Sequence, residues 1–147
     1  MKLVDANVLL YAVNSDAPQH EPARSWLDRA LSGDATVAFA WVALLAFVRL
    51  STKTGLFPAP LTTDAAMDRV DAWLAAPPAV VVEPTVSHGS IMRELLANVG
   101  TGGNLTTDAH LAALAVEHRC AVVSFDNDFG RFAGVTWQHP ATQPPGT

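Results

Sequence analysis

The chain alternates short apolar runs with longer segments in which apolar residues recur at helical spacing. The short runs are rich in valine and predict strands at residues 2–4, 37–39, 80–82 and 121–124, with 135–137 as the candidate fifth. The helical spacing predicts helices over residues 6–13, 22–31, 41–53, 63–74, 87–98 and 105–118. Such alternation is typical of a parallel sheet covered on both faces. We therefore predict an α/β fold: a single domain with a mostly parallel central sheet of four or five strands flanked by helices.

The predicted domain spans residues 1–139, and residues 140–147, which carry three prolines, are expected to form a flexible tail. The longest run without a charged residue, at 35–48, has fourteen residues. A helix needs about 20 apolar residues to span a bilayer, so this run is better read as a buried strand and helix. No signal-peptide core follows Lys2 and Asp5. We expect a cytoplasmic protein without a membrane partner.

Composition narrows the class of protein. The 147 residues are 50% apolar and 16% charged, with a net charge of −5 and a single cysteine, Cys120. These values exclude a disordered or fibrous chain and a disulfide within the chain. Since there is no basic tail or stripe, a polyanion would bind only at a local patch or through a metal ion that masks acidic groups.

Four aspartates border apolar segments of the predicted fold. Asp5 follows the first strand, Asp126 and Asp128 follow the fourth, and Asp108 lies at the start of the last helix. Ligands of parallel sheets bind beyond the carboxyl ends of the strands. Two carboxylates about 4 Å apart repel by about 4 kcal/mol at an effective dielectric of about 20. No lysine or arginine lies within these motifs, so converging acids need a cation, and all-oxygen ligands suit Mg²⁺ or Mn²⁺.

Each acid also has a simpler explanation. Asp5 could cap the helix that begins at residue 6, and Asp108 could be a first-turn acid favoured by the helix dipole. Residues 126–128 could form a solvated turn. It is the combination of the acids, at strand ends and a helix start, that favours a metal site.

Three motifs resemble those of PIN domains. They are Val-Asp-Ala-Asn-Val-Leu at 4–9, Asp-Ala-His-Leu-Ala-Ala-Leu-Ala at 108–115, and Ser-Phe-Asp-Asn-Asp-Phe at 124–129. Their order, their spacing and the chain length are similar to those of the VapC toxins of type II toxin–antitoxin systems. The resemblance implies an Mg²⁺- or Mn²⁺-dependent endoribonuclease that cuts structured RNA, chiefly transfer or ribosomal RNA. It also implies a cognate antitoxin whose carboxyl-terminal segment covers the site, and a homodimer.

By the same resemblance, catalytic and metal-binding roles fall on four acids: Asp5, Asp108, Asp126 and Asp128. Asn7 and Ser124 match polar positions that support the cluster. One position departs from the family pattern, because Ala46 stands where a glutamate is usual. Either Asp128 makes up the number of acids, or the metal site is weakened, or activity is lost; we favour the first.

Two basic residues are candidates for RNA contacts. Ala46, Arg49 and Lys53 share one face of the predicted helix at spacings of three, four and seven, so Arg49 and Lys53 could hold phosphates beside the metal site. A solvated helix edge is the alternative. His88 and His110 are expected to have packing or surface positions, and His118 shows no partner at useful spacing.

Two other functions compete with a ribonuclease toxin. The first is a PIN-like module that binds an antitoxin or RNA without cutting, which Ala46 motivates. The second is a phosphatase or phosphoacceptor of the haloacid-dehalogenase or response-regulator kind, which also uses strand-end aspartates and Mg²⁺. The former of these prefers two acids after its first strand, where only Asp5 is present, and both require a lysine that neither Lys2 nor Lys53 supplies.

Overall fold

The computed structural model describes residues 1–100 and 102–142. Its centre is one sheet of five parallel strands in the order β3-β2-β1-β4-β5. The strands are β1 (Lys2–Val4), β2 (Val37–Phe39), β3 (Ala79–Val81), β4 (Ala121–Val123) and β5 (Trp137–Gln138). The predicted α/β class with a parallel sheet is confirmed.

Six α-helices connect and cover the strands. They are α1 (Ala6–Val13), α2 (His20–Ser32), α3 (Trp41–Ser51), α4 (Thr63–Ala75), α5 (His88–Val99) and α6 (Thr106–His118). Two 3₁₀ turns, η1 (Gly103–Leu105) and η2 (Asn127–Arg131), lie before α6 and after β4.

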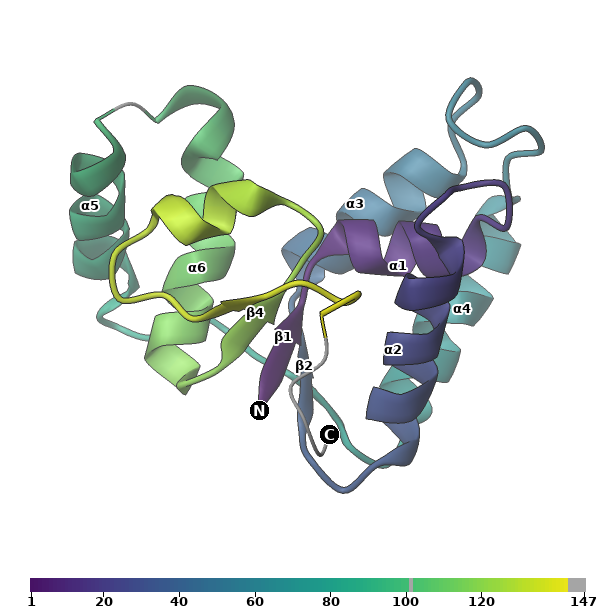
Figure 1. Cartoon of the computed structure of the whole chain (residues 1–147), viewed down its shortest axis with the longest axis horizontal. Coiled ribbons are helices and arrows are strands. Elements are labelled where there is room, and N and C mark those ends of the chain that lie inside the picture. The colour runs from purple at the N-terminus through teal and green to yellow at the C-terminus, as the bar shows by residue number, and fades with distance from the viewer. Residues whose placement is uncertain (101, 143–147) are drawn as a thin grey trace.

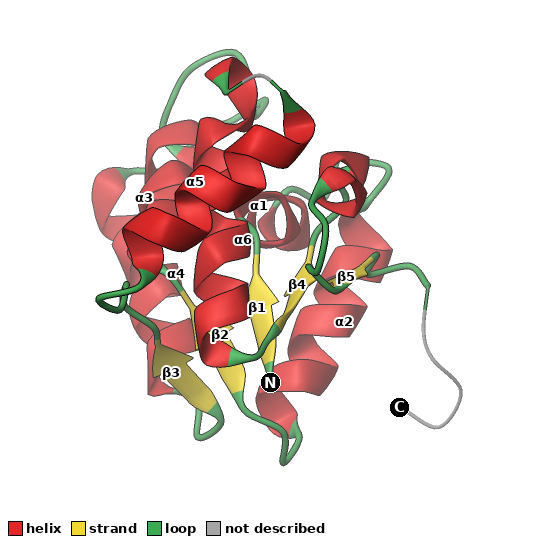
Figure 2. Cartoon of the chain, turned by 90° about the vertical axis from the view of Figure 1, so that its left-hand side faces the viewer, coloured by secondary structure: helices red, strands yellow, loops and turns green. Residues whose placement is uncertain are grey.

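The two faces of the sheet carry separate apolar cores. Successive strand residues point to opposite faces, so Leu3 packs with α5 and α6, whereas Val4 packs with α1, α2, α3 and α4. Figure 1 shows these helices on the two sides of the sheet, and Figure 2 shows α5 and α6 in front of it. The edge of the sheet is thus left between two packed layers.

The order of the strands creates a switch point beside β1. From β1 the chain moves outward through β2 to β3, then returns to the other side of β1 as β4 and β5. Crevices outside such a point are where open α/β sheets bind ligands. Here the neighbouring carboxyl ends are those of β1 and β4, which lead directly into Asp5 and Ser124.

Helix α3 ends earlier than the sequence predicts. We expected it to reach residue 53, but its last residue is Ser51. The Thr52 hydroxyl donates to the Val48 carbonyl at 2.7 Å, and the Leu61 amide donates to the Ser51 carbonyl at 2.9 Å. A further helical turn would bond the Ser51 carbonyl to the Gly55 amide. Because Leu61 takes that carbonyl, the helix ends and Lys53 lies in the turn that follows.

The structure also bears on the expected absence of a membrane span and on the expected end of the domain. Among the described residues, no helix is long and apolar enough to cross a bilayer. The predicted domain boundary at residue 139 stays a prediction, because residues 143–147 of the expected tail lie outside the described residues.

Candidate functional site

Asp5 links the first helix to the fourth strand. Its extended backbone makes it the N-cap of α1, and its Oδ1 accepts a hydrogen bond from the Ala6 amide at 2.7 Å. Its Oδ2 accepts another from the Ser124 hydroxyl at 2.7 Å. The simple explanation of Asp5 as a helix cap is therefore correct, yet the second oxygen also joins it to the end of β4.

Ser124 and Asn7 connect the two neighbouring strand ends. The buried Ser124 hydroxyl accepts bonds from the Asn7 Nδ2 at 3.0 Å and from the Asp126 amide at 2.9 Å. The Asn7 Oδ1 accepts the Phe125 amide at 3.2 Å. This network fixes the loop after β4 relative to α1; that Asn7 and Ser124 thereby support a metal site, as the resemblance implies, stays a prediction.

Three of the predicted acids converge beyond the carboxyl end of β4. One oxygen each from Asp108, Asp126 and Asp128 lies within 4.8 Å of the others. Asp108 is in the first turn of α6, and Asp126 is the N-cap of η2, its Oδ1 accepting the Asp128 amide at 2.9 Å. We call these three acids, together with Asp5, the acid cluster.

The acid cluster carries more negative charge than its surroundings balance. Burial, followed by the charges of Asp5, Asp126 and Asp128, raises the pKa of Asp108 to about 7. Burial also raises the pKa of Asp5, against the lowering effect of its bonds from Ser124 and Ala6. Because repulsion between carboxylates makes ionisation unfavourable, a bound cation would relieve it. A donor set made only of carboxylate oxygens fits a hard divalent ion such as Mg²⁺ or Mn²⁺.

Position 46 faces the acid cluster. A small cavity of about 40 Å³ is lined by Asp5, Ala46 and Asp108, among others. The helix that carries Ala46 therefore lies where the resemblance places a glutamate, but the alanine side chain offers no oxygen to the site. Room is left for a longer side chain beside two of the acids.

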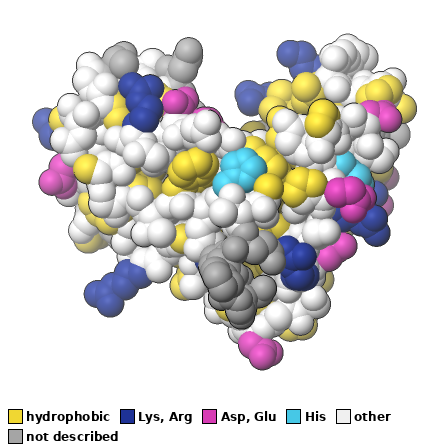
Figure 3. All heavy atoms as spheres, in the orientation of Figure 1, with side chains coloured by type: hydrophobic (Ala, Val, Ile, Leu, Met, Phe, Trp, Pro, Cys, Tyr) yellow, Lys and Arg dark blue, Asp and Glu magenta, His cyan; other side chains and the backbone are white. Residues whose placement is uncertain are grey.

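Arg49 and Lys53, the two predicted RNA-contact residues, take no part in the hydrogen bonds and the ion pair described for the acid cluster. Arg49 is an exposed residue of α3, and Lys53 is exposed in the turn beyond it. They do not share one helical face as predicted, because the helix ends before Lys53. Figure 3 shows a hollow between the α5–α6–η2 side and the α3–α4 side of the molecule, with Lys and Arg side chains on both sides of it.

Sequence reasoning missed a positive charge at the site. The Arg131 Nη1 lies 3.7 Å from the Asp128 Oδ1, an i,i+3 pair on η2. The motif at 124–129 ends two residues before it, so it appeared to contain no base. A 3₁₀ turn brings residues i and i+3 above one another, and this spacing is the signal that could have found Arg131.

A second polar cluster, formed by Thr85, His88, His110 and Glu117, joins α5 to the other end of α6. The His88 Nδ1 is 2.5 Å from the Glu117 Oε2, and the His88 Nε2 is 2.8 Å from the His110 Nδ1. Glu117 also accepts from the Thr85 amide at 2.7 Å and the Thr85 hydroxyl at 2.5 Å. We call this group the α5–α6 clamp. Nearby, the His118 Nε2 forms a hydrogen bond with the Glu83 carbonyl at 2.7 Å, a partner that the sequence did not predict.

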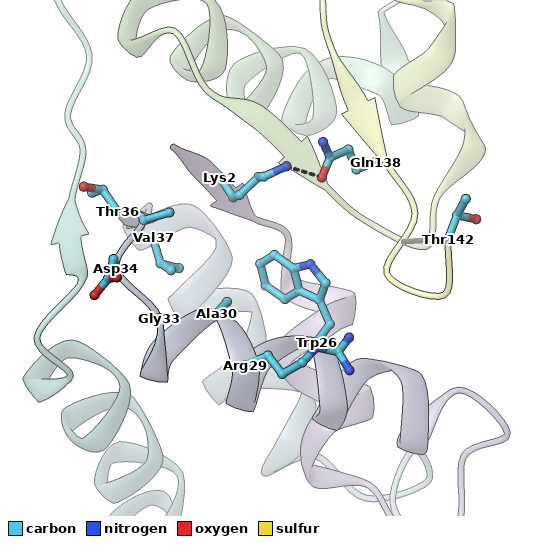
Figure 4. A pocket seen from close by; sticks show the side chains of 11 residues that line it. Lys2, Trp26, Arg29, Ala30, Gly33, Asp34, Thr36, Val37, Gln138 and Thr142 are labelled. Atoms are coloured by element: carbon cyan, nitrogen blue, oxygen red, sulfur yellow. Dashed lines mark hydrogen bonds between the residues drawn. The ribbon is translucent and has the colours of Figure 1, made fainter. Parts of the chain in front are cut away.

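A larger cavity lies away from the acids. It has a volume of about 360 Å³ and lies between α2 and the starts of β1 and β2, around Trp26, Arg29 and Lys2. Figure 4 shows the Trp26 ring between α2 and the Lys2–Gln138 hydrogen bond. Since Lys2 and Asp5 are at opposite ends of β1, this cavity is separate from the acid cluster.

Comparison with known proteins agrees with this architecture. The PIN domain model matches residues 2–135. Ribonuclease VapC37 of Mycobacterium tuberculosis is 64% identical over 140 residues, which cover 95% of this chain and 97% of that protein.

Solved structures show the same fold at lower identity. VapC20 of Mycobacterium tuberculosis, a toxin that cleaves the sarcin-ricin loop, superimposes with a TM-score of 0.70 at 18% identity, covering 98% of this chain and 100% of that one. The VapBC2 complex of Rickettsia felis, bound to a fragment of promoter DNA, has a chain that superimposes with a TM-score of 0.68 at 14% identity, covering 94% and 97%. With its sheet order and the match over residues 2–135, the chain belongs to the PIN domain family and, within it, to the VapC proteins.

Proposed function

We propose that the protein is a metal-dependent endoribonuclease, the toxin component of a toxin–antitoxin system, which hydrolyses phosphodiester bonds in structured RNA of the transfer or ribosomal class. The observation that carries this proposal is the convergence of Asp108, Asp126 and Asp128 beside Asp5 at the switch point of the sheet. The 64% identity to a protein named as a ribonuclease supports the same reaction.

In this proposal the four acids hold Mg²⁺ or Mn²⁺. The chemistry that such an ion would supply at these acids is polarisation of a phosphate oxygen and activation of a water as the nucleophile for hydrolysis. Because the pKa of Asp108 is raised to about 7, a fraction of the molecules would hold a proton there at neutral pH, and this carboxyl would lose that proton to serve as a cation ligand. Ser124 and Asn7 keep Asp5 and the loop after β4 in register, so that the oxygens converge before substrate arrives.

The substrate approaches through the hollow between the two halves of the molecule. The carboxyl ends of β1 and β4 point toward that hollow (Figures 1 and 3). Arg49 and Lys53, on the α3 side, would contact RNA phosphates, since a net charge of −5 leaves binding to local basic patches. RNA folded into loops offers phosphates and unpaired bases to such a shape.

A cognate antitoxin and a second copy of the chain complete the proposed assembly. The Rickettsia felis relative of known structure is a VapBC2 complex, and by that likeness we expect an antitoxin whose carboxyl-terminal segment covers the acid cluster. We expect the toxin to act in the cytoplasm, where its RNA substrates are, and as a homodimer.

Cleavage of total RNA by purified, antitoxin-free protein tests the proposal. The parent should release discrete fragments in Mg²⁺ or Mn²⁺ and none in EDTA, and Asp5→Asn should release none. Asp68→Asn removes an exposed carboxylate from α4 and serves as the matched control that cleaves like the parent. Equal cleavage by the parent and a folded Asp5→Asn protein would refute the ribonuclease assignment to this site.

A catalytically weakened module that binds antitoxin or RNA is the second candidate. The cavity of about 40 Å³ beside Ala46 favours it, because a carboxylate is missing at that point. In that case Ala46→Glu should create metal-dependent cleavage that the parent lacks. The phosphatase alternative has lost its support, because the chain is a PIN domain and Lys2 lies at the start of β1, bonded to Gln138.

A further inference from the structure

We propose that Arg131 is a phosphate-binding residue of the RNA site, holding the substrate backbone next to the acid cluster. This inference rests on the proposed ribonuclease function and adds a residue that the resemblance does not assign. It begins from position: the Arg131 Nη1 is 3.7 Å from the Asp128 Oδ1, and among the ion pairs of the described residues only this one includes an acid of the cluster.

The backbone that carries Arg131 is firmly anchored. Phe129 and Phe132, on either side of it, are buried in the core under α6, and η2 is capped by Asp126. The guanidinium itself is not buried, since 49% of the Arg131 side chain and 46% of the Asp128 side chain are exposed. A fixed backbone with an accessible charged group is the arrangement that a phosphate-binding side chain requires.

The ion pair with Asp128 contributes too little to stability to explain why an arginine occupies position 131. Exposed pairs of this kind contribute little to folding because solvent screens them. The arginine also opposes cation binding, since its positive charge stands beside the acids that would hold the ion. A negatively charged ligand of the site would give the exposed guanidinium a second partner besides Asp128.

An RNA phosphodiester is such a group. It carries negative charge into a site of four carboxylates, and it needs positive partners on the protein as well as the ion. The guanidinium offers several N–H donors in a planar fork that matches two phosphate oxygens, which a lysine ammonium cannot do. At 3.7 Å from the Asp128 Oδ1, the Arg131 Nη1 is beyond hydrogen-bond distance of that oxygen, so it can donate to a phosphate at the same place.

A simpler role makes different predictions. If Arg131 were only a counter-ion for Asp128, its removal would tighten Mn²⁺ binding and leave RNA binding unchanged. If it holds a phosphate, its removal weakens RNA binding and lowers the salt dependence of that binding.

The test compares Arg131→Gln and Arg131→Lys with Arg24→Gln. Arg24 is a matched control, because its Nε is also 3.7 Å from a carboxylate, that of Asp28 on α2, and it is exposed. Binding of fluorescently labelled total transfer RNA is measured against salt in the presence of Mn²⁺, with each substitution placed in the Asp5→Asn protein to prevent cleavage. Thermal unfolding confirms the fold of each variant, and calorimetry with Mn²⁺ alone reports the metal affinity.

We expect Arg131→Gln to weaken RNA binding about tenfold, as for loss of a charge-assisted hydrogen bond, and to reduce the salt slope by about 1. Arg131→Lys should restore the salt slope and only part of the affinity, and Arg24→Gln should match the parent. In the cleaving background, KM should rise more than kcat falls.

The outcomes separate this inference from the proposed function. If Arg131→Gln weakens RNA binding while the parent cuts no RNA, the phosphate contact stands and the catalytic proposal fails. If the parent cuts RNA and Arg131→Gln binds and cuts it equally well, the inference about Arg131 is wrong and the ribonuclease stands. A parent that binds no RNA overturns both.

Discussion

Helix α6 carries two polar clusters of opposite electrostatic character. At its first turn, Asp108 joins the acid cluster and its pKa is raised to about 7, first by burial and then by the neighbouring acids. In its last turn, Glu117 joins the α5–α6 clamp, and its pKa is lowered although burial alone would raise it. Both are carboxylates at the edge of the same apolar helix, so the difference comes from what surrounds them.

The clamp is satisfied by its own donors. Glu117, whose side chain is only 1% exposed, accepts bonds from the Thr85 amide, the Thr85 hydroxyl and His88. The acid cluster instead brings three of its carboxylates, those of Asp108, Asp126 and Asp128, within 4.8 Å of one another, with the exposed Arg131 beside Asp128. A buried polar group with its partners is part of the fold, whereas an unbalanced group of acids indicates a ligand.

The largest expected effect is the loss of activity from the acid cluster. Asp108→Asn should reduce RNA cleavage by about a thousandfold, because it removes one oxygen ligand and one charge from the proposed ion site. Glu117→Gln should leave the cleavage rate within a few-fold of the parent's. Initial rates on one defined RNA fragment measure both, and a larger loss in Glu117→Gln than in Asp108→Asn would reverse the functional ranking of the two clusters.

The next largest effect is on the stability of the fold, and here Glu117→Gln should be more damaging than Asp108→Asn. Glu117→Gln should lower the free energy of unfolding by about 1–3 kcal/mol, since a buried, hydrogen-bonded carboxylate is replaced by a group that pairs poorly with His88 and Thr85. Asp108→Asn should not destabilise the metal-free protein, because it removes repulsion. Urea unfolding at pH 7.5 in EDTA measures this; a stable Glu117→Gln protein would show that the clamp does not hold α5 to α6.

Local sequence patterns predicted the acid cluster but missed the α5–α6 clamp, and the reason is physical. Each acid of the acid cluster is next to a strand end or a helix start, and parallel strands bring such positions to one edge. The clamp depends on the docking of α5 against α6, which pairs His88 with Glu117 across 29 positions. His110 and Glu117 are seven residues apart, a spacing that puts them on one face of α6, but the sequence does not show what that face meets.

The fold class was predicted correctly, with small errors at the ends of individual helices and strands. Helix α1 and strands β1 and β2 agree with their predicted residues, because an apolar core requires those residues on both sides. The helix was predicted to reach Lys53 because Gly55 and Pro58 are the residues that close it in the sequence. In the structure, the Ser51 carbonyl accepts the Leu61 amide and the Ser51 and Thr52 hydroxyls donate to the Val48 carbonyl, and the helix ends at Ser51. Such local competition between side chains and the backbone decides helix ends, and it changes the surroundings of a candidate RNA contact.

The two carboxylates should also give opposite responses to pH. The folded-state pKa of Asp108 is above its ordinary value of 3.8, so its contribution favours the folded protein at low pH and is lost as pH rises toward about 7. The folded-state pKa of Glu117 is below its ordinary 4.5, so its contribution is present above that value and is lost in acid.

Metal-free unfolding at pH 5 and pH 8 measures the first of these responses. Asp108→Asn should remove about 1 kcal/mol of the parent's loss of stability between the two pH values, a figure reduced from the full pKa shift because Asp108 is only half-buried. Asp68→Asn, which removes an exposed carboxylate of α4 far from the two clusters' contacts, should leave that difference unchanged. An identical pH response in the parent and Asp108→Asn would show that the acids do not repel one another in the folded protein.

The last effect is the pH dependence of the stabilisation by a cation, and it tests which cluster holds one. At pH 8 and a Mn²⁺ concentration about ten times its Kd, the parent should gain about 1.4 kcal/mol of unfolding free energy. At pH 6 protons occupy most Asp108 carboxyls, given a pKa of about 7, so the apparent Kd should rise about tenfold and the gain should fall to about 0.4 kcal/mol. Glu117→Gln should show the same gains as the parent, and Asp108→Asn should show a smaller gain at pH 8 that barely changes at pH 6. Because the two variants each remove one carboxylate charge from the same helix, a Mn²⁺ response lost equally in both would mean that the ion senses only net charge, and that the geometry of the acid cluster does not define its site.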